Sequence, residues 1–182
     1  MKRVLVTGAT GFIGRHCVES LVSAGYRVHA LFPPSETPFN LTQEVEWHAC
    51  DLMDPTHCTA IWAEVRPTHL LHLAWTTTQG EYYHSLENLK WVEVGTRLFL
   101  LAVKYECRRI VCAGTSAEYD WSEGICRENN TPSKPSSLYG TCKNSLKEIL
   151  LSFAERTGLE AVWGRIFFCY GPWEHPARLV PY

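Results

Sequence analysis

The sequence has no long hydrophobic run and no block of like charges. Its first apolar stretch covers only residues 4–7, and no other stretch approaches the roughly 18 apolar residues that a membrane-spanning helix requires. Lysine and arginine are scattered and the formal net charge is −2, so neither a nucleic-acid partner nor a membrane-surface patch is expected. With no recognisable signal peptide, these absences predict a cytoplasmic protein.

Spacings typical of metal sites and of redox cysteine pairs are also absent. None of the eight cysteines forms a CxxC pair, so they are expected to be free and mostly buried thiols. The eight histidines contain neither an HxxxH nor an HExxH pattern, so the sequence predicts no metal site. The chain of 182 residues is long enough for one well-packed domain.

What is present is an alternation of short apolar runs with helix-like stretches. The apolar runs do not alternate with polar residues, which indicates strands that are covered on both faces. This order predicts an α/β fold of Rossmann-like type, a doubly wound parallel sheet with helices on both faces and ligands at the carboxyl ends of the strands. Strands are expected at 2–7, 27–32, 45–50, 69–74, 109–113 and 159–166, and helices at 12–24, 54–62, 86–105 and 139–157.

Three glycines follow the first predicted strand at three-residue spacing, in the segment VLVTGATGFIG. Gly8 allows a tight turn, Gly11 lets a pyrophosphate approach the backbone, and Gly14 lets the helix pack against the strand. The free N–H groups of the helix that begins at Phe12 would then face the phosphates. The alternative is a glycine-rich turn without a ligand.

Six motifs appear in an order that resembles the extended short-chain dehydrogenase/reductases, the NAD(P)-dependent epimerase/dehydratase group. The resemblance covers about residues 1–172 and implies NAD or NADP as cofactor and a nucleotide sugar as substrate. It implies hydride transfer, commonly at C4, by a 4-epimerase or 4-ketoreductase, and often a homodimer formed through helices 86–105 and 139–157. The motifs are TGATGFIG, Asp51-Leu52, HLAW (72–75), TSAEY (115–119), YGTCK (139–143) and RIFFCYGP (165–172).

Tyr139, Lys143 and Thr115 are the candidate catalytic residues. Tyr139 and Lys143 are four residues apart, so they share a helix face, and the ammonium group would lower the pKa of the phenol. The alternative is a surface Tyr/Lys pair. By resemblance, the Thr115 hydroxyl positions the reacting oxygen, with Ser116 as a substitute; the alternative is a threonine that bonds the local backbone.

The resemblance also implies the contacts of the cofactor and the substrate. For Asp51 the alternative role is a helix cap, for His72 a buried core histidine is favoured, and for Phe167 and Phe168 the alternative is a core aromatic pair. Substrate contacts are implied for Trp75, Ser116, Ala117 and Phe168. Cofactor contacts are implied for Gly8, Thr10, Gly11, Phe12, Ile13, Gly14, Arg15, Asp51, Leu52, Leu73, Ala74, Trp75, Tyr139, Lys143 and Phe167.

The sequence departs from the family pattern in places that bear on the chemistry. Sugar-nucleotide 4,6-dehydratases carry Asp-Glu where this chain has Ser116-Ala117, so dehydration ranks low, and Glu118 is expected to point elsewhere. Phe32 stands where an acidic residue would bind the ribose 2′-hydroxyl.

Two further departures concern the cofactor and a polar residue of the site. Arg15 could meet a 2′-phosphate, which slightly favours NADP and leaves NAD open. Val92 replaces a common asparagine, and Asn88 is a candidate substitute.

The chain ends soon after the last motif. We expect residues 1–172 to form the dinucleotide-binding domain and 173–182 to begin a substrate-binding region that is mostly absent, either in a fragment or in a naturally short form. That expectation argues against turnover by this chain alone. It keeps open an NAD(P)-binding module or sensor without turnover and a fragment of a sugar-nucleotide dehydratase; a partner-binding role rests only on Trp121 and Trp173, expected at the surface.

Overall fold

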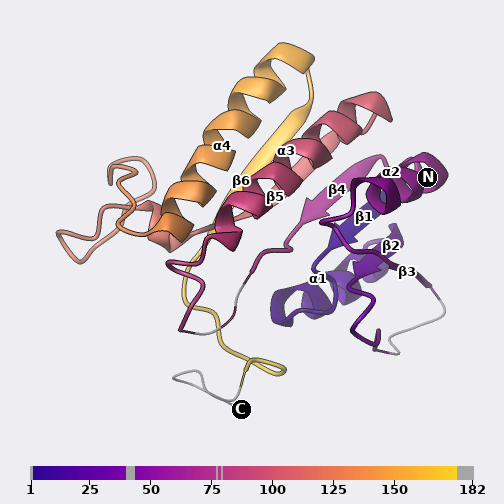
Figure 1. Cartoon of the computed structure of the whole chain (residues 1–182), viewed down its shortest axis with the longest axis horizontal. Coiled ribbons are helices and arrows are strands. Elements are labelled where there is room, and N and C mark those ends of the chain that lie inside the picture. Colours follow the sequence, from indigo (N-terminus) through magenta and orange to yellow (C-terminus); the bar gives the residue numbers. More distant parts are fainter. Residues whose placement is uncertain (1, 40–43, 77, 79, 176–182) are drawn as a thin grey trace.

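The computed structural model describes residues 2–39, 44–76, 78 and 80–175 and arranges strands and helices in alternation (Figure 1). The elements are β1 (Arg3–Thr7), α1 (Phe12–Ser23), β2 (Arg27–Phe32), β3 (Val45–Ala49), α2 (Pro55–Val65), β4 (His69–His72), α3 (Glu87–Lys104), β5 (Arg109–Thr115), the 3₁₀ turn η1 (Ser116–Glu118), α4 (Leu138–Thr157) and β6 (Glu160–Ile166).

The six strands form one parallel sheet in the order β3-β2-β1-β4-β5-β6. The chain therefore builds outward from β1 to one side, crosses over, and builds from β4 to the other side. This is the strand order of a doubly wound dinucleotide-binding sheet, whose crevice lies between the carboxyl ends of β1 and β4. The predicted α/β Rossmann-like fold is confirmed.

Helices cover both faces of the sheet and bury two apolar clusters. On one face, Leu5 and Leu70 pack with Trp62 of α2, Leu98 of α3 and Leu146 of α4. On the other face, the neighbouring strand residues contact α1 (Figure 1), in a cluster that contains Val4, Val6, Val18, Val28 and Ala30. Burial on both faces explains why the strands read as continuous apolar runs.

Local chemistry sets the ends of the helices. Asp54 accepts hydrogen bonds from the N–H groups of Thr56 and His57, and Pro55 occupies the first position of α2. Ser137 caps α4, and Gly158 ends it in a left-handed conformation with φ of 72°. α2 continues three residues past its predicted end, to Val65.

Two strand ends differ from the prediction by two residues, and the other strand ends differ by one residue at most. β4 stops at His72 rather than Ala74, because the N–H of Ala74 turns to the Thr7 hydroxyl at 3.3 Å. β5 continues to Thr115, because it pairs with β6 as far as Ile166. Both differences are set by the neighbouring strand rather than by the segment itself.

Further expectations can be compared with the described part of the chain. None of its helices has the length and apolar character needed to cross a membrane. All eight cysteines are free and five are buried, as predicted. Trp121 and Trp173 are exposed, also as predicted. The region expected at 173–182 lies outside the described residues from 176 onward.

Gly140 offers a test of how closely α4 packs against η1. A Cβ there would overlap the carbonyl oxygen of Ala117 in η1 and lie 2.9 Å from the Pro135 Cβ. Since backbone cannot yield as a side-chain tip can, Gly140→Ala should lower the free energy of unfolding by about 1–3 kcal/mol, measured by urea denaturation. The neighbouring Thr141→Ala, at an exposed position, should change it by less than about 0.5 kcal/mol. Equal changes in the free energy of unfolding in the two variants would show that α4 does not pack closely against η1.

Candidate active site

The glycine turn packs tightly against the end of β4. Gly8 has φ of +69°, and a Cβ there would lie 2.7 Å from the backbone nitrogen of Ala74. A Cβ on Gly14 would overlap the Gly8 carbonyl oxygen, so the helix can approach the strand only with glycine at this position. Gly11 is exposed and would meet only the Gly8 oxygen, at 3.3 Å. The open side of the turn is therefore at Gly11.

The amino-terminal end of α1 fits an anionic group. Gly11 is its N-cap and provides no side-chain hydrogen bond, so the first N–H groups of α1 lack a side-chain acceptor. Phe12 and Ile13 follow as half-buried residues, and the Thr10 carbonyl accepts a hydrogen bond from Arg15 Nε at 2.9 Å. Free N–H groups and the helix dipole together bind phosphate.

Asp51 and Leu52, which the family resemblance places at the adenosine end of the cofactor, have local partners. Asp51 is exposed and accepts a hydrogen bond from the Met53 N–H at 2.8 Å, whereas the cap of α2 is Asp54. Leu52 is buried in the core.

Arg15, the other residue considered at this end, is held between two rings. Its guanidinium lies 4.4 Å from the ring centre of Phe39 and 5.1 Å from that of Trp173. Phe32 contacts Trp47 edge-on, with ring centres 6.1 Å apart.

Trp75 is anchored behind the end of β4, beyond the half-buried Leu73 and Ala74. Its indole N–H donates to Asn88 Oδ1 at 2.8 Å, and the Asn88 amide nitrogen donates to the carbonyls of Tyr82 and Ser85, each at 2.7 Å. Asn88 is fully buried, and these bonds give partners to both the oxygen and the nitrogen of its amide. Sequence reasoning considered Asn88 as a substitute for a missing asparagine; in the structure its side chain orients Trp75.

Trp75 brings Tyr139 and Lys143 together. The Lys143 ammonium lies 4.0 Å from the Trp75 ring centre and donates to the Ala113 carbonyl at 2.8 Å. The Tyr139 ring meets the same indole edge-on at 6.4 Å and also packs against Tyr82. The pair is therefore not a surface pair on one helix, because Lys143 is only 4% exposed.

The Lys143 ammonium is a poorly solvated charge. Burial lowers its pKa to about 8, although nearby Cys112 and Glu118 act in the opposite direction. The Ala113 carbonyl and the indole face are the polar partners that partly replace water around the ammonium. A cation at this depth keeps a strong field, because little solvent screens it.

Thr115 ends β5 and its side chain bonds the local backbone. The hydroxyl oxygen accepts a hydrogen bond from the Ala117 N–H at 3.2 Å, and Glu118 Oε1 accepts one from the Thr115 N–H at 2.8 Å. This pair is a capping box for η1. Thr115 and Ser116 are each 8% exposed and Ala117 is half-buried.

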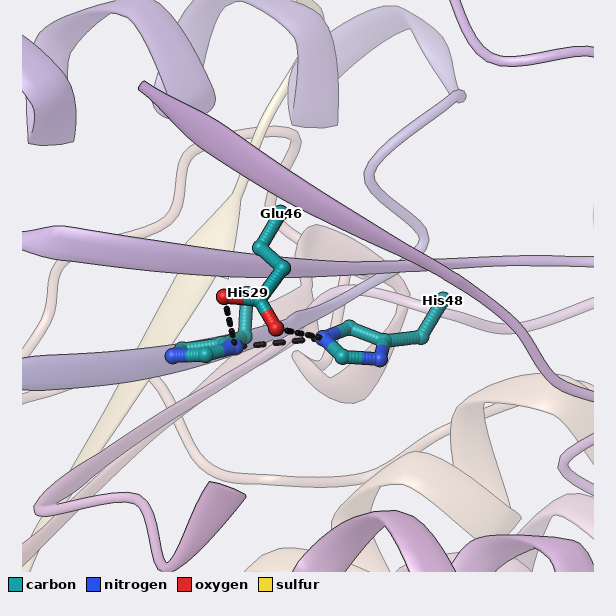
Figure 2. Close-up of side chains that lie close together, drawn as sticks. All are labelled: His29, Glu46 and His48. Atoms are coloured by element: carbon teal, nitrogen blue, oxygen red, sulfur yellow. Dashed lines mark hydrogen bonds and ion pairs between the residues drawn. The ribbon is translucent and has the colours of Figure 1, made fainter. Parts of the chain in front are cut away.

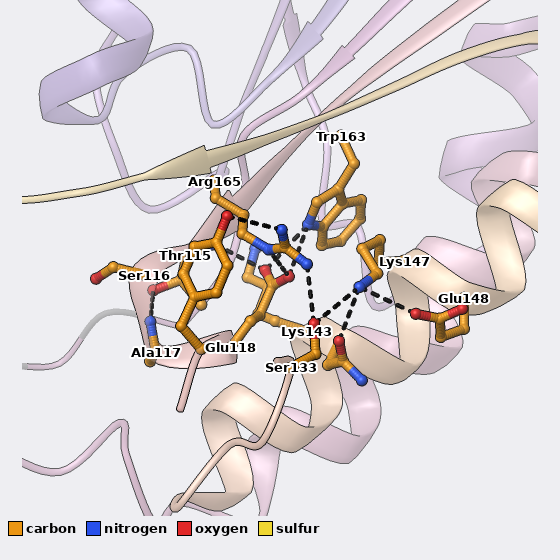
Figure 3. A network of polar contacts seen from close by, with 12 residues as sticks. Thr115, Ser116, Ala117, Glu118, Ser133, Lys143, Lys147, Glu148, Trp163 and Arg165 are labelled. Carbon is orange, nitrogen blue, oxygen red and sulfur yellow. Dashed lines mark hydrogen bonds and ion pairs between the residues drawn. The ribbon is translucent and has the colours of Figure 1, made fainter. Parts of the chain in front are cut away.

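Glu118 points into a buried network behind Thr115 (Figure 3). Its carboxylate is fully buried and accepts hydrogen bonds from Trp163 Nε1 at 3.0 Å and Arg165 Nε at 2.9 Å. Arg165 also donates to the Tyr119 hydroxyl at 2.9 Å and to Ser133 at 3.0 Å. The expectation that Glu118 points elsewhere is confirmed, and the network, which the sequence did not reveal, fixes the end of β5 against β6.

Phe167 and Phe168 do not form a core pair. They are 44% and 81% exposed, and each packs against Trp121, with ring centres about 6 Å apart (6.1 and 6.2 Å). Phe167 also contacts Tyr119. The sequence-based alternative of a core aromatic pair is wrong, because both residues come after the end of β6, where the chain has left the sheet.

His72 is a buried histidine beneath the site, as favoured from the sequence. Its Nδ1 lies 2.7 Å from the Thr7 hydroxyl, and its Nε2 is buried without a hydrogen-bond partner. Burial, with the nearby Lys143 charge, lowers the pKa of His72 to about 3. The imidazole therefore stays neutral at physiological pH.

Comparison with known proteins places these features in a family context. Residues 4–182 match the family described as "NAD dependent epimerase/dehydratase family". The dTDP-6-deoxy-L-talose 4-dehydrogenase (NAD(+)) of Aggregatibacter actinomycetemcomitans is 29% identical over 92% of this chain and 62% of its own length. The UDP-glucose 4-epimerase of Neisseria meningitidis serogroup C is 29% identical over 82% of this chain and 48% of its own length.

Solved structures of similar proteins share the fold. The UDP-glucose 4-epimerase of Thermotoga maritima, solved with UDP-glucose, superposes with a TM-score of 0.83 at 25% identity, over 97% of this chain and 59% of that chain. The Thermus thermophilus UDP-glucose 4-epimerase in complex with NAD gives a TM-score of 0.75 at 30% identity, over 90% and 54%. This chain thus spans about half to three-fifths of the length of these relatives.

His72 predicts a pH dependence of stability. Its pKa is about 3 when folded and 6.5 when exposed, so the unfolded state binds the proton first as the pH falls below 6.5. Between pH 7 and pH 5 this group should remove about 2 kcal/mol from the free energy of unfolding. In His72→Gln that part of the decrease should be absent, as measured by urea denaturation at both pH values. An equal decrease in the free energy of unfolding in the two proteins would show that His72 binds a proton as readily in the folded state as in the unfolded state.

Proposed function

Because the chain belongs to the NAD dependent epimerase/dehydratase family, we propose that it binds NAD and transfers hydride at C4 of a nucleotide sugar, as a 4-epimerase or 4-ketoreductase. The observation that carries the proposal is that Tyr139 and Lys143 of α4 contact Trp75, which follows the end of β4 beside the glycine turn. A buried cation, a phenol and a phosphate-binding turn at one edge of a parallel sheet suit hydride transfer.

Each polar residue of this cluster has a distinct role in the proposed reaction. NAD, when bound, supplies the acceptor and donor of hydride. Tyr139 takes the proton from the sugar C4 hydroxyl as the ketone forms and returns it when the ketone is reduced. The charge on Lys143 favours the phenolate, and the Thr115 hydroxyl donates its proton to the reacting oxygen and so orients it.

We propose NAD rather than NADP as the cofactor. The preference for NADP rested on Arg15, but its Nε–H is donated to the Thr10 carbonyl and its face is stacked on Phe39. The Thermus thermophilus and Bordetella bronchiseptica relatives were solved with NAD or NAD⁺. Titration with both dinucleotides tests this choice, since a phosphate-binding arginine would make NADP the tighter ligand.

The arrangement around η1 argues against a dehydratase. Elimination of water needs an acid and a base beside the sugar, and Ser116-Ala117 provides neither. Glu118, the nearest carboxylate along the chain, is fully buried and bound to Trp163 and Arg165. A binding module without turnover is the competing function that the experiments below separate from the proposed one.

We also propose a homodimer formed through α3 and α4, which pack side by side (Figure 1). Leu89, Leu100 and Val103 lie along one face of α3 and are 56%, 63% and 42% exposed. Ile149 of α4 is 41% exposed. An apolar surface of this kind on two adjacent helices is typical of a protein interface.

Tyr139→Phe tests the proposed chemistry. The variant should keep the NAD affinity of the parent and lose turnover by about 10²–10⁴-fold, because only the transferable proton is removed. Binding is measured by titration, and turnover with a panel of UDP-, dTDP- and GDP-linked sugars and their 4-keto forms. Tyr26→Phe, which removes a phenol beside His69 on β4, is the matched control and should leave both unchanged.

The outcomes separate the competing functions. Full activity in Tyr139→Phe would remove the phenol from the reaction. Tight NAD binding by the parent with no turnover of any sugar would favour the binding module, and no binding of either dinucleotide would overturn both.

Leu100→Glu tests the proposed dimer. A charge placed in an apolar interface should shift the chain to monomer, as measured by sedimentation equilibrium. Ala63→Glu, which adds the same charge at an exposed position of α2, should leave the parent mass unchanged. A monomeric parent would disprove the dimer.

A further inference from the structure

Two histidines and a glutamate converge on the sheet at its β2–β3 edge (Figure 2). In the register of the sheet, His29 pairs with Glu46 and Leu31 pairs with His48. Glu46 and His48 are two residues apart on β3, so they point to the same face of the sheet as His29. That face is opposite to α1, since Leu5 and Leu31, which share it, pack in the cluster with α2.

The distances between the ligand atoms suit one metal ion. His29 Nδ1 lies 3.1 Å from His48 Nε2 and 3.7 Å from Glu46 Oε2, and His48 Nε2 lies 3.9 Å from Glu46 Oε1. Ligands about 2.0–2.1 Å from a tetrahedral Zn²⁺ are about 3.4 Å apart. The three groups therefore need to move by only a few tenths of an ångström, and the ion would keep an open fourth position.

His29 lacks a sufficient packing reason to be a histidine. It is 3% exposed, and its Nε2 is buried without a hydrogen-bond partner. Among the described residues, its ring forms a hydrogen bond with His48 and an ion pair with Glu46, both through Nδ1. A buried imidazole with one unsatisfied nitrogen costs stability that an aliphatic residue would not. A metal bond at Nδ1 would offset that cost.

Two arginines lie near the three proposed ligands. Arg27 competes for Glu46, with its Nη2 3.1 Å from Oε2, and together with Arg3 it adds positive charge near His29. The Arg27–Glu46 pair is about half exposed, at 52% and 45%, so giving it up costs little.

We propose that His29, Glu46 and His48 bind a divalent transition-metal ion of the Zn²⁺ class. Two imidazoles and one carboxylate are ligands that Zn²⁺ accepts. β3 is the edge strand of the sheet that the described residues form, and it pairs with β2, so the ion would clamp it to the sheet. The clamped strand leads into Asp51 and Leu52, for which the family resemblance implies contacts with the cofactor. The site does not depend on that function, since its residues lie outside the Tyr139 cluster.

Zinc titration of the whole chain tests the site. In a Cys126→Ser/Cys169→Ser background, which removes an exposed and a half-buried thiol that could bind zinc, calorimetry should show one Zn²⁺ per chain. Saturating Zn²⁺ should also raise the melting temperature. His48→Ala should weaken Zn²⁺ binding by at least about tenfold, the loss that even removal of an outer-shell partner causes.

Two further variants keep the test independent of folding. His29→Leu should keep or raise the melting temperature without metal and lose the Zn²⁺-induced rise. Arg27→Ala should bind Zn²⁺ at least as tightly as the parent, because it frees Glu46. His57→Ala, at an exposed histidine 3.9 Å from Asp54, is the control and should behave like the parent. Absence of saturable binding, or an equal Zn²⁺ affinity in His29→Leu and the parent, would overturn the proposal.

Discussion

The two halves of the sheet join at the β1–β4 pair, and the glycine turn after β1 lies close against the end of β4. Gly8 reaches Ala74 only because it has no Cβ and adopts a left-handed backbone. The Thr7 hydroxyl accepts a hydrogen bond from the Ala74 N–H and also contacts His72, so β4 ends at His72. The residue after Ala74, Trp75, therefore lies at the same edge of the sheet as the amino-terminal end of α1.

The electrostatics of the site follow from that placement. Trp75, fixed by Asn88, provides the face that partly solvates the Lys143 ammonium, and His72 below it stays neutral. The buried positive charge of Lys143 thus lies near a neutral His72. Glu118 is close enough to influence Lys143, yet its bonds to Trp163 and Arg165 keep it from becoming the direct partner of the ammonium.

Sequence reasoning predicted the features that local rules control. The glycine spacing and the shared face of Tyr139 and Lys143 depend on residues a few positions apart. The bond from Trp75 to Asn88 and the Glu118 network depend on how distant segments pack, which no local pattern states. His29, Glu46 and His48 were missed because their spacing becomes meaningful only with the β2–β3 register; the E-x-H alternation on a strand was the one available signal.

The link between Tyr119 and Ser133 sets apart one stretch of surface chain. The two residues form an isolated antiparallel bridge, Asp120 N–H donates to the Pro132 carbonyl, and Arg165 contacts both Tyr119 and Ser133. The segment between them, residues 121–132, therefore leaves the body of the domain and returns to it at almost the same point. Insertions or deletions within this segment can accumulate without moving α4. The surface beside Phe167 can therefore change during evolution while the site residues on α4 keep their positions.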